Sequence, residues 1–187
     1  MSSDAFQTRG QSFEEGYFRN KDAEVVDKLR HIFQTKLDKD ALRAATGITN
    51  DEVLERLVAV SIRGEMLAVF KLYPLVEIAW ADGRVDQSEA DAVLAAAVKV
   101  GIPQTGEAID RLKDWLKRGP NDDARAVWKM FAAELRKTLS PAELAEFRDD
   151  LLKFANSVAR ASGGFLGLMQ VDAREQRIID AINRLLG

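Results

Sequence analysis

The sequence predicts an all-α fold, a helical bundle of about eight or nine helices. No long segment alternates polar and apolar residues as a half-buried strand does, and alanine and leucine outnumber clusters of β-branched residues. All four prolines stand where a helix is expected to begin, end or bend. A helix–acidic turn–helix unit also occurs twice, around residues 80–89 and again around residues 160–175. The bundle is therefore expected to contain a duplicated unit.

Capping residues and one glycine define the first two expected helices. Ser12 and Glu15 have the spacing of a capping box, in which each side chain bonds the backbone N–H of the other residue. The helix that they open is expected to end within residues 33–36. A short helix over Asp38–Thr46 is expected to stop at Gly47, because glycine readily adopts the left-handed conformation that ends many helices.

The next two helices are also bounded by local signals. Thr49 and Glu52 form a second capping box, and Gly64 marks the end of the helix that they open. The helix over Met66–Ala81 contains Pro74, which lacks a backbone N–H and predicts a kink or a restart at that point.

The remaining helices follow from the same signals. Asp86 and Glu89 form a third box, and Ser140 with Glu143 forms a fourth around Pro141, which suits the first helical position. In the helix that Asp86 opens, the residues expected to be buried are Val93, Leu94, Ala97 and Val98. The helices themselves are expected over residues 86–101, 105–116, 122–135, 140–161 and 172–186.

The chain is expected to divide near residue 63. Residues 1–63 are more charged and should form an N-terminal helical extension, whereas residues 64–187 hold both copies of the repeated unit and form the main helical domain. No Ser/Gly-rich linker separates the two parts, so we expect a packed extension in place of an independent domain.

Charge and composition argue against several classes of protein. The 27 basic and 30 acidic residues leave a net charge of -3, without the basic face that nucleic-acid binding needs. The absence of cysteine excludes disulfides and thiolate metal sites. No secretory signal is visible, and the most apolar stretch, residues 66–81, is interrupted by charge and proline. We expect a soluble cytoplasmic protein without a transmembrane segment; association with the periphery of a membrane stays open.

The segment Trp80–Glu89, the first acidic turn, carries the strongest candidate site. Asp82, Asp86 and Glu89 match the second half of an EF-hand calcium loop, whose glycine falls on Gly83. The first and third positions of that loop fall on Ile78 and Trp80, which have no carboxylate, so a divalent cation such as Ca²⁺ or Mg²⁺ would be held weakly, with the help of water. The same residues also have an explanation without metal, because glycine suits the turn and the acids cap the next helix.

The second turn, residues 160–175, keeps the cap but loses one acid. Ser162 stands where the first copy has Asp82, and a glycine-rich apolar stretch is inserted before Asp172. Large apolar side chains in such a loop either pack over the edge of the core or contact a protein partner. The candidate partner-binding residues are Phe165, Leu168 and Met169.

No set of residues suited to catalysis is found in the sequence, so we expect a protein that is not an enzyme. His31 is the only histidine, and no nucleophile or second metal ligand stands at a recognisable spacing from it. The three tryptophans stand among apolar residues and are expected in the core. Acidic residues outside the turns mostly stand three or four positions from Lys or Arg and are expected on solvated faces.

The stretch Val76–Glu89 resembles the signature of TerB-like (tellurite-resistance protein B) domains, and residues 155–186 look like the second half of the unit that this family repeats. The resemblance covers residues 64–187. It implies an all-helical fold, a cytoplasmic or membrane-peripheral setting and a link to tellurite or other stress responses. Related domains also occur as scaffold modules attached to other proteins.

The same resemblance implies acidic residues at the turns that can bind metal ions. The matching positions in this chain are Asp82, Asp86 and Glu89. Ser162 departs from the pattern, because it lacks the acid that a second metal site needs.

Residues 13–65 show a fainter likeness to the zeta-type inhibitor subunit of bacterial ATP synthases, through Phe13-Glu14-Glu15 and Tyr17-Phe18. That likeness implies that the N-terminal helix docks on a partner. The leading hypothesis is a non-enzymatic helical interaction or stress-response domain with a weak divalent-cation site at the first acidic turn. The alternative is a protein-binding scaffold module with no metal site, in which the acids serve only as helix caps.

Overall fold

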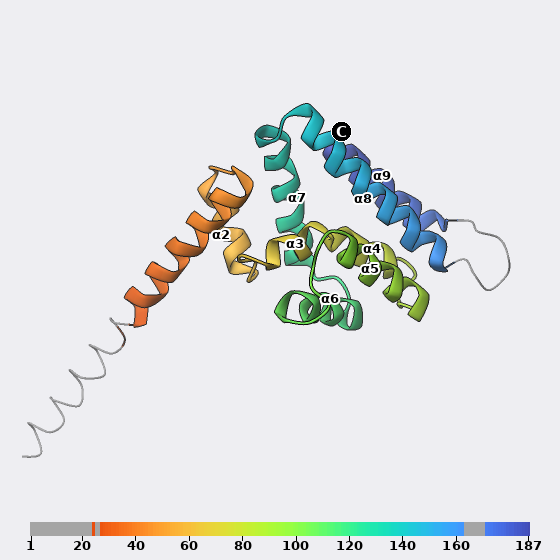
Figure 1. Ribbon diagram of the computed structural model, residues 1–187, viewed down its shortest axis with the longest axis horizontal. Helices are drawn as coiled ribbons and strands as arrows, with labels where there is room; N and C mark the ends of the chain where they lie inside the picture. The colour runs from red at the N-terminus through yellow and green to blue at the C-terminus, as the bar shows by residue number, and fades with distance from the viewer. Residues whose placement is uncertain (1–23, 25–26, 163–170) are drawn as a thin grey trace, which may run out of the picture. The chain divides into compact units, whose positions relative to one another are not determined.

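The computed structural model describes residues 24, 27–162 and 171–187 (Figure 1). Over this part of the chain it contains nine helices and no strand, which confirms the predicted all-α fold. None of the described helices combines the length and the apolar character needed to cross a bilayer. The chain divides into two compact units, Met1–Asp38 and Lys39–Gly187.

One helix covers residues 27–46, so the break predicted within residues 33–38 is wrong. Neither glycine nor proline interrupts this stretch. Gln34 Nε2 donates a hydrogen bond to Asp38 Oδ1 at 2.9 Å, which joins successive turns at the point where the break is predicted. The predicted helix start at Ser12 lies outside the described residues.

Eight further helices follow in the second unit. They are α2 (Asp51–Ala59), α3 (Met66–Lys71), α4 (Tyr73–Ala79), α5 (Gln87–Lys99), α6 (Glu107–Arg118), α7 (Asp122–Thr138), α8 (Pro141–Ser162) and α9 (Ala173–Leu186). The restart predicted at Pro74 is confirmed, because α3 ends before this residue and α4 has it in its first turn. The cap predicted at Thr49 is wrong by one residue: Asn50 Oδ1 accepts hydrogen bonds from the first backbone N–H groups of α2.

The two copies of the repeated unit pack on one another. α4 and α5 form the first copy, and α8 and α9 form the second. α8 contacts α4, α5 and α9, and α9 also contacts α4. Figure 1 shows α8 and α9 side by side, in blue. Each copy therefore buries its apolar face against the other, as helices with one apolar stripe must.

The hydrophobic core lies in the second unit. Its buried apolar side chains, among the residues described, fall between Leu42 and Leu186. α2, which precedes the domain boundary predicted near residue 63, packs on α7 and contributes four buried residues to this core. The predicted boundary itself stays a prediction. Trp128 is buried as expected, whereas Trp80 and Trp115 are half-buried against the core.

The apolar stripe predicted for α5 is partly wrong. Val93 and Ala97 are fully buried, but Leu94 is only partly covered and Val98 is 44% exposed. Glu89 is buried on the same helix. The periodicity of the sequence predicts a buried stripe slightly too far toward the end of α5, because periodicity does not specify which neighbouring helices cover each side chain.

Candidate functional site

The first acidic turn joins α4 to α5. Gly83 has a φ of +95°, the left-handed conformation expected of it. Asp82 folds back on the turn: its Oδ1 accepts a hydrogen bond from the Arg84 backbone N–H at 3.1 Å, and its Oδ2 lies 3.6 Å from Arg84 Nε. Both side chains are largely exposed, and exposed ion pairs contribute only about 0–1 kcal/mol to stability. Asp82 is therefore held at the surface by its own turn.

Asp86 and Glu89 form the predicted capping box at the start of α5. The Glu89 backbone N–H donates to Asp86 Oδ1, and the Asp86 backbone N–H donates to Glu89 Oε2, each over 2.9 Å. Glu89 is nevertheless only 5% exposed. Its pKa is raised to about 7, first by burial and then by the negative charges of Asp86, Asp82 and Glu175, against the lowering effect of the Asp86 N–H.

The second turn brings a matching carboxylate, Glu175, close to the first. Asp172 and Glu175 form a capping box on α9, in which the Asp172 backbone N–H donates to Glu175 Oε2 at 2.7 Å. Glu175 is buried, and its charge acts on the pKa of Glu89. The sequence indicates Glu175 only as part of a cap. Its equivalence to Glu89 in the repeat is the signal that could have identified it as a site residue.

The hydrogen bonds of Asp82, Asp86 and Glu89 described above are those of helix caps and turn formers. Among the residues that the structure describes, no group of three or more His, Cys, Asp or Glu side chains is arranged to hold a metal ion. Asp82, Asp86 and Glu89 lie in one turn, but each carboxylate accepts a hydrogen bond from a backbone N–H. Binding of Ca²⁺ or Mg²⁺ at this turn stays a prediction.

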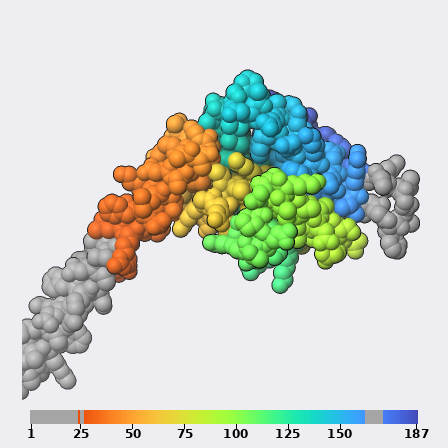
Figure 2. All heavy atoms as spheres, in the orientation of Figure 1, coloured from red at the N-terminus to blue at the C-terminus, as the bar shows by residue number. Residues whose placement is uncertain are grey.

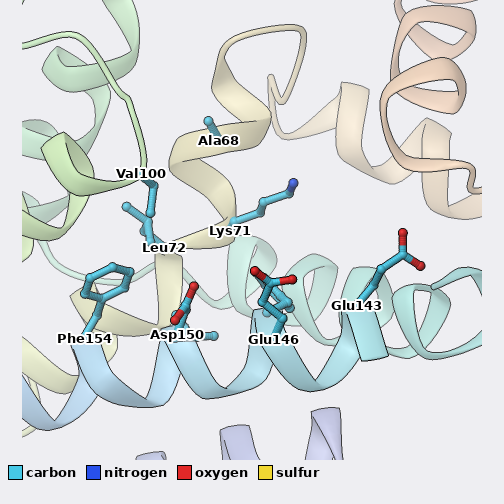
Figure 3. Close-up of a pocket in the computed structure, with 10 residues that line it drawn as sticks. Ala68, Lys71, Leu72, Val100, Glu143, Glu146, Asp150 and Phe154 are labelled. Atoms are coloured by element: carbon cyan, nitrogen blue, oxygen red, sulfur yellow. The ribbon is translucent and has the colours of Figure 1, made fainter. Parts of the chain in front are cut away.

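A groove of about 330 Å³ lies between α3 and α8 in the second unit (Figure 3). Figure 2 shows the same unit as spheres, with α8 in blue beside α3–α5 in yellow and green. The apolar lining of the groove consists of Ala68, Leu72, Val100, Phe147, Leu151 and Phe154. The lining residues of α8 recur at intervals of three and four, which puts them on one face of that helix.

Three carboxylates and one ammonium group border this apolar floor. Glu143, Glu146 and Asp150 project from α8, and Lys71 projects from α3 (Figure 3). Asp150 forms an exposed ion pair with Lys153 at 2.9 Å. Glu146 makes no hydrogen bond or ion pair within the described part of the chain. The groove therefore combines apolar surface with a net negative rim.

The groove is not predicted from the sequence. The sequence predicts that the acids of α8 lie on a solvated face, because basic residues stand one turn away from several of them. The sequence does contain one indication of the groove, because Glu143, Glu146 and Asp150 alternate with Phe147 and Leu151 along one face of the helix. Which neighbour covers that face cannot be deduced from one helix.

Comparison with protein-family models, with curated proteins and with solved structures finds no match for this chain. The fold and the site define a class, an all-α protein with a duplicated, capped turn and an acid-rimmed apolar groove. The resemblance to TerB-like domains stays a prediction. The candidate partner-binding residues Phe165, Leu168 and Met169 lie outside the described residues.

Proposed function

We propose that this protein is a non-enzymatic helical interaction module that binds a basic amphipathic helix of a protein partner. The observation that carries the proposal is the groove between α3 and α8, in which an apolar floor lies beside three carboxylates. Helices that dock in grooves use apolar anchors three or four residues apart. Desolvated apolar contacts supply most of the affinity, and complementary charges at the rim supply rate and specificity.

The spacing of the carboxylates suits a helical partner. Glu143, Glu146 and Asp150 extend over about 10 Å of the α8 axis. A partner helix that lies along α8 presents Lys or Arg side chains at the same intervals, with its apolar face turned toward Phe147 and Phe154. Arg or Lys above such rings adds a cation–π attraction of about 0.5–1 kcal/mol at exposed sites.

The test is a titration of a labelled model peptide, an amphipathic helix of leucine and lysine, into the protein. We expect binding that Glu146→Lys weakens roughly tenfold or more, because a like charge then faces the peptide at the rim. The measurement is fluorescence anisotropy at moderate ionic strength.

The matched control is Asp149→Lys. It makes the same change of charge on the same helix, at a side chain that is 54% exposed and does not line the groove. We expect this variant to bind the peptide like the parent protein, and both variants to keep the parent melting temperature. Equal losses in the two variants, or no binding by the parent protein, contradict the proposal.

A divalent cation at the first acidic turn is the second candidate function. Asp82, Asp86, Glu89 and Glu175 bring negative charges near one another, and two of these carboxylates are buried. A cation with oxygen ligands would relieve their mutual repulsion if the caps rearranged around it. The resemblance to TerB-like domains supports the same candidate, a stress-response domain linked to tellurite resistance.

The cation is tested by calorimetric titration of Ca²⁺, Mg²⁺ and Mn²⁺ into chelator-treated protein. We expect Asp82→Asn to weaken binding and to leave the fold intact, because Asp82 bonds only within its own turn. Absence of heat and of any shift in melting temperature at millimolar ion rules the cation site out.

A further inference from the structure

The N-terminal unit carries an apolar helix face that no other described residue covers. The side chains of Leu29, Ile32, Phe33 and Leu37 are between 49% and 66% exposed. They stand at positions i, i+3, i+4 and i+8 of the helix over residues 27–46, and so lie on one face of it. A contiguous exposed apolar face of this kind is typical of an interaction surface.

The same segment is basic. Residues 28–37 contain Lys28, Arg30 and Lys36 and no acidic residue. Arg30 pairs with Asp27 at 3.3 Å, but both side chains are more than 70% exposed, so this pair holds the arginine only weakly. The segment thus has both properties that the proposed partner of the groove requires, an apolar face and flanking cations.

We infer that residues 28–37 of one copy of this chain bind in the groove between α3 and α8 of a second copy. The inference rests on the proposed function and names its partner. When each copy supplies a helix and a groove, reciprocal binding closes a two-fold symmetric dimer in which both apolar surfaces are covered. Without the dimer, the apolar face of residues 28–37 and the apolar floor of the groove would remain exposed to water.

The charges of the two surfaces match in spacing as well as in sign. Lys28 and Lys36 are about 12 Å apart along their helix, and Glu143 and Asp150 are about 10 Å apart along α8. A helix that lies along α8 therefore places a lysine near each end of the acidic rim. Phe33, between the two lysines, faces the apolar floor in this arrangement.

The test is sedimentation velocity of the full chain over a range of protein concentrations. We expect a dimer that dissociates on dilution and when salt is raised from ~0.1 M to ~1 M, because exposed ion pairs are screened over that range. Lys36→Glu and Glu146→Lys each alter an exposed side chain. Each variant alone should raise the dimer dissociation constant roughly tenfold or more, because like charges then meet at the rim.

Mixing the two variants gives the decisive measurement. In the mixed dimer the helix that carries Lys36→Glu meets the groove that carries Glu146→Lys, so the two changed side chains have opposite charges, and the remaining helix and groove are those of the parent protein. We expect the equimolar mixture to dimerise as tightly as the parent. Restored dimerisation also shows that both variants fold.

Three outcomes overturn the inference. The first is a parent protein that stays monomeric while the lysine peptide still binds the groove, which leaves the proposed function intact. The second is a monomer whose groove binds no peptide, which overturns the proposed function as well. The third is a dimer that neither substitution weakens, or that mixing the weakened variants does not restore.

Discussion

Glu89 and Glu143 occupy the same position of a capping box, yet their surroundings move their pKa values in opposite directions. Ser140 donates hydrogen bonds to the Glu143 carboxylate from its hydroxyl at 2.6 Å and its backbone N–H at 2.9 Å, and these bonds lower the pKa. Glu89 also accepts a backbone hydrogen bond, but it is buried, and burial raises its pKa to about 7. One sequence pattern thus produces two carboxylates that respond to different pH ranges.

We expect Glu89 to make the protein less stable as the pH rises from about 5 to about 8. A carboxyl whose pKa rises from 4.5 to about 7 on folding binds its proton more tightly in the folded state. Its contribution is complete below a pH of about 4.5 and is lost as the pH rises through about 7, a change of about 1–3 kcal/mol. Glu89→Gln should remove this fall, because the amide oxygen can accept the same N–H without a charge. Urea unfolding at each pH measures it.

Glu143→Gln is the control for this prediction. The pKa of Glu143 is lowered, so its contribution to stability is present at neutral pH and is lost only as the pH falls below about 4.5. This variant should therefore keep the parent dependence on pH between about 5 and about 8. A Glu89→Gln variant with the same pH dependence as the parent would show that Glu89 does not titrate in this range.

At the scale of the element, the end of the first helix depends on a glycine and on a distant helix. Gly47 follows the last helical residue with a φ of +71°, and its backbone N–H donates to the Arg43 carbonyl at 2.8 Å. A Cβ added to Gly47 would lie 2.7 Å from Cγ2 of Thr138, the last residue of α7. The predicted stop at Gly47 is local, whereas the contact with α7 follows from packing.

We expect Gly47→Ala to lower the free energy of unfolding by about 2–4 kcal/mol, since left-handed strain adds to the clash with Thr138. Gly101→Ala is the matched control. Gly101 has a φ of +85° and an added Cβ there meets nothing within 4 Å, so only the strain of about 1–2 kcal/mol is expected. Thr138→Ser removes Cγ2 and should restore part of the stability of Gly47→Ala. Equal losses in the two alanine variants would argue against the clash.

Local sequence signals predict some of the helix ends correctly and others incorrectly. The box of Ser140 and Glu143 was predicted from two side chains and is present, because both partners lie within one turn. The sequence does not distinguish Asn50 from Thr49 as the cap of α2, since both residue types cap helices well. The break predicted before Asp38 does not occur, because a cap-forming residue can also lie inside a helix when its side chain bonds a neighbouring turn, as that of Asp38 does with Gln34.

At the scale of the whole molecule, the candidate sites join residues that are far apart in the chain. The groove requires α3 beside α8, and the proximity of the buried side chains of Glu89 and Glu175 requires the first copy of the repeated unit beside the second. The exposed apolar face of residues 28–37 lies in the other compact unit. Each surface can be recognised as a candidate binding site only when the burial of the side chains around it is known.

The sequence by itself determined the all-α fold, the restart at Pro74 and the capping boxes at Asp86, in the first acidic turn, and at Ser140. These features depend on backbone hydrogen bonds and dihedral preferences that involve residues within one or two turns. Only the tertiary structure decided that Glu89 is buried near Glu175 and that the acids of α8 border a groove. Burial and pKa depend on neighbours that are distant in sequence, and periodicity along one helix does not specify which neighbours those are.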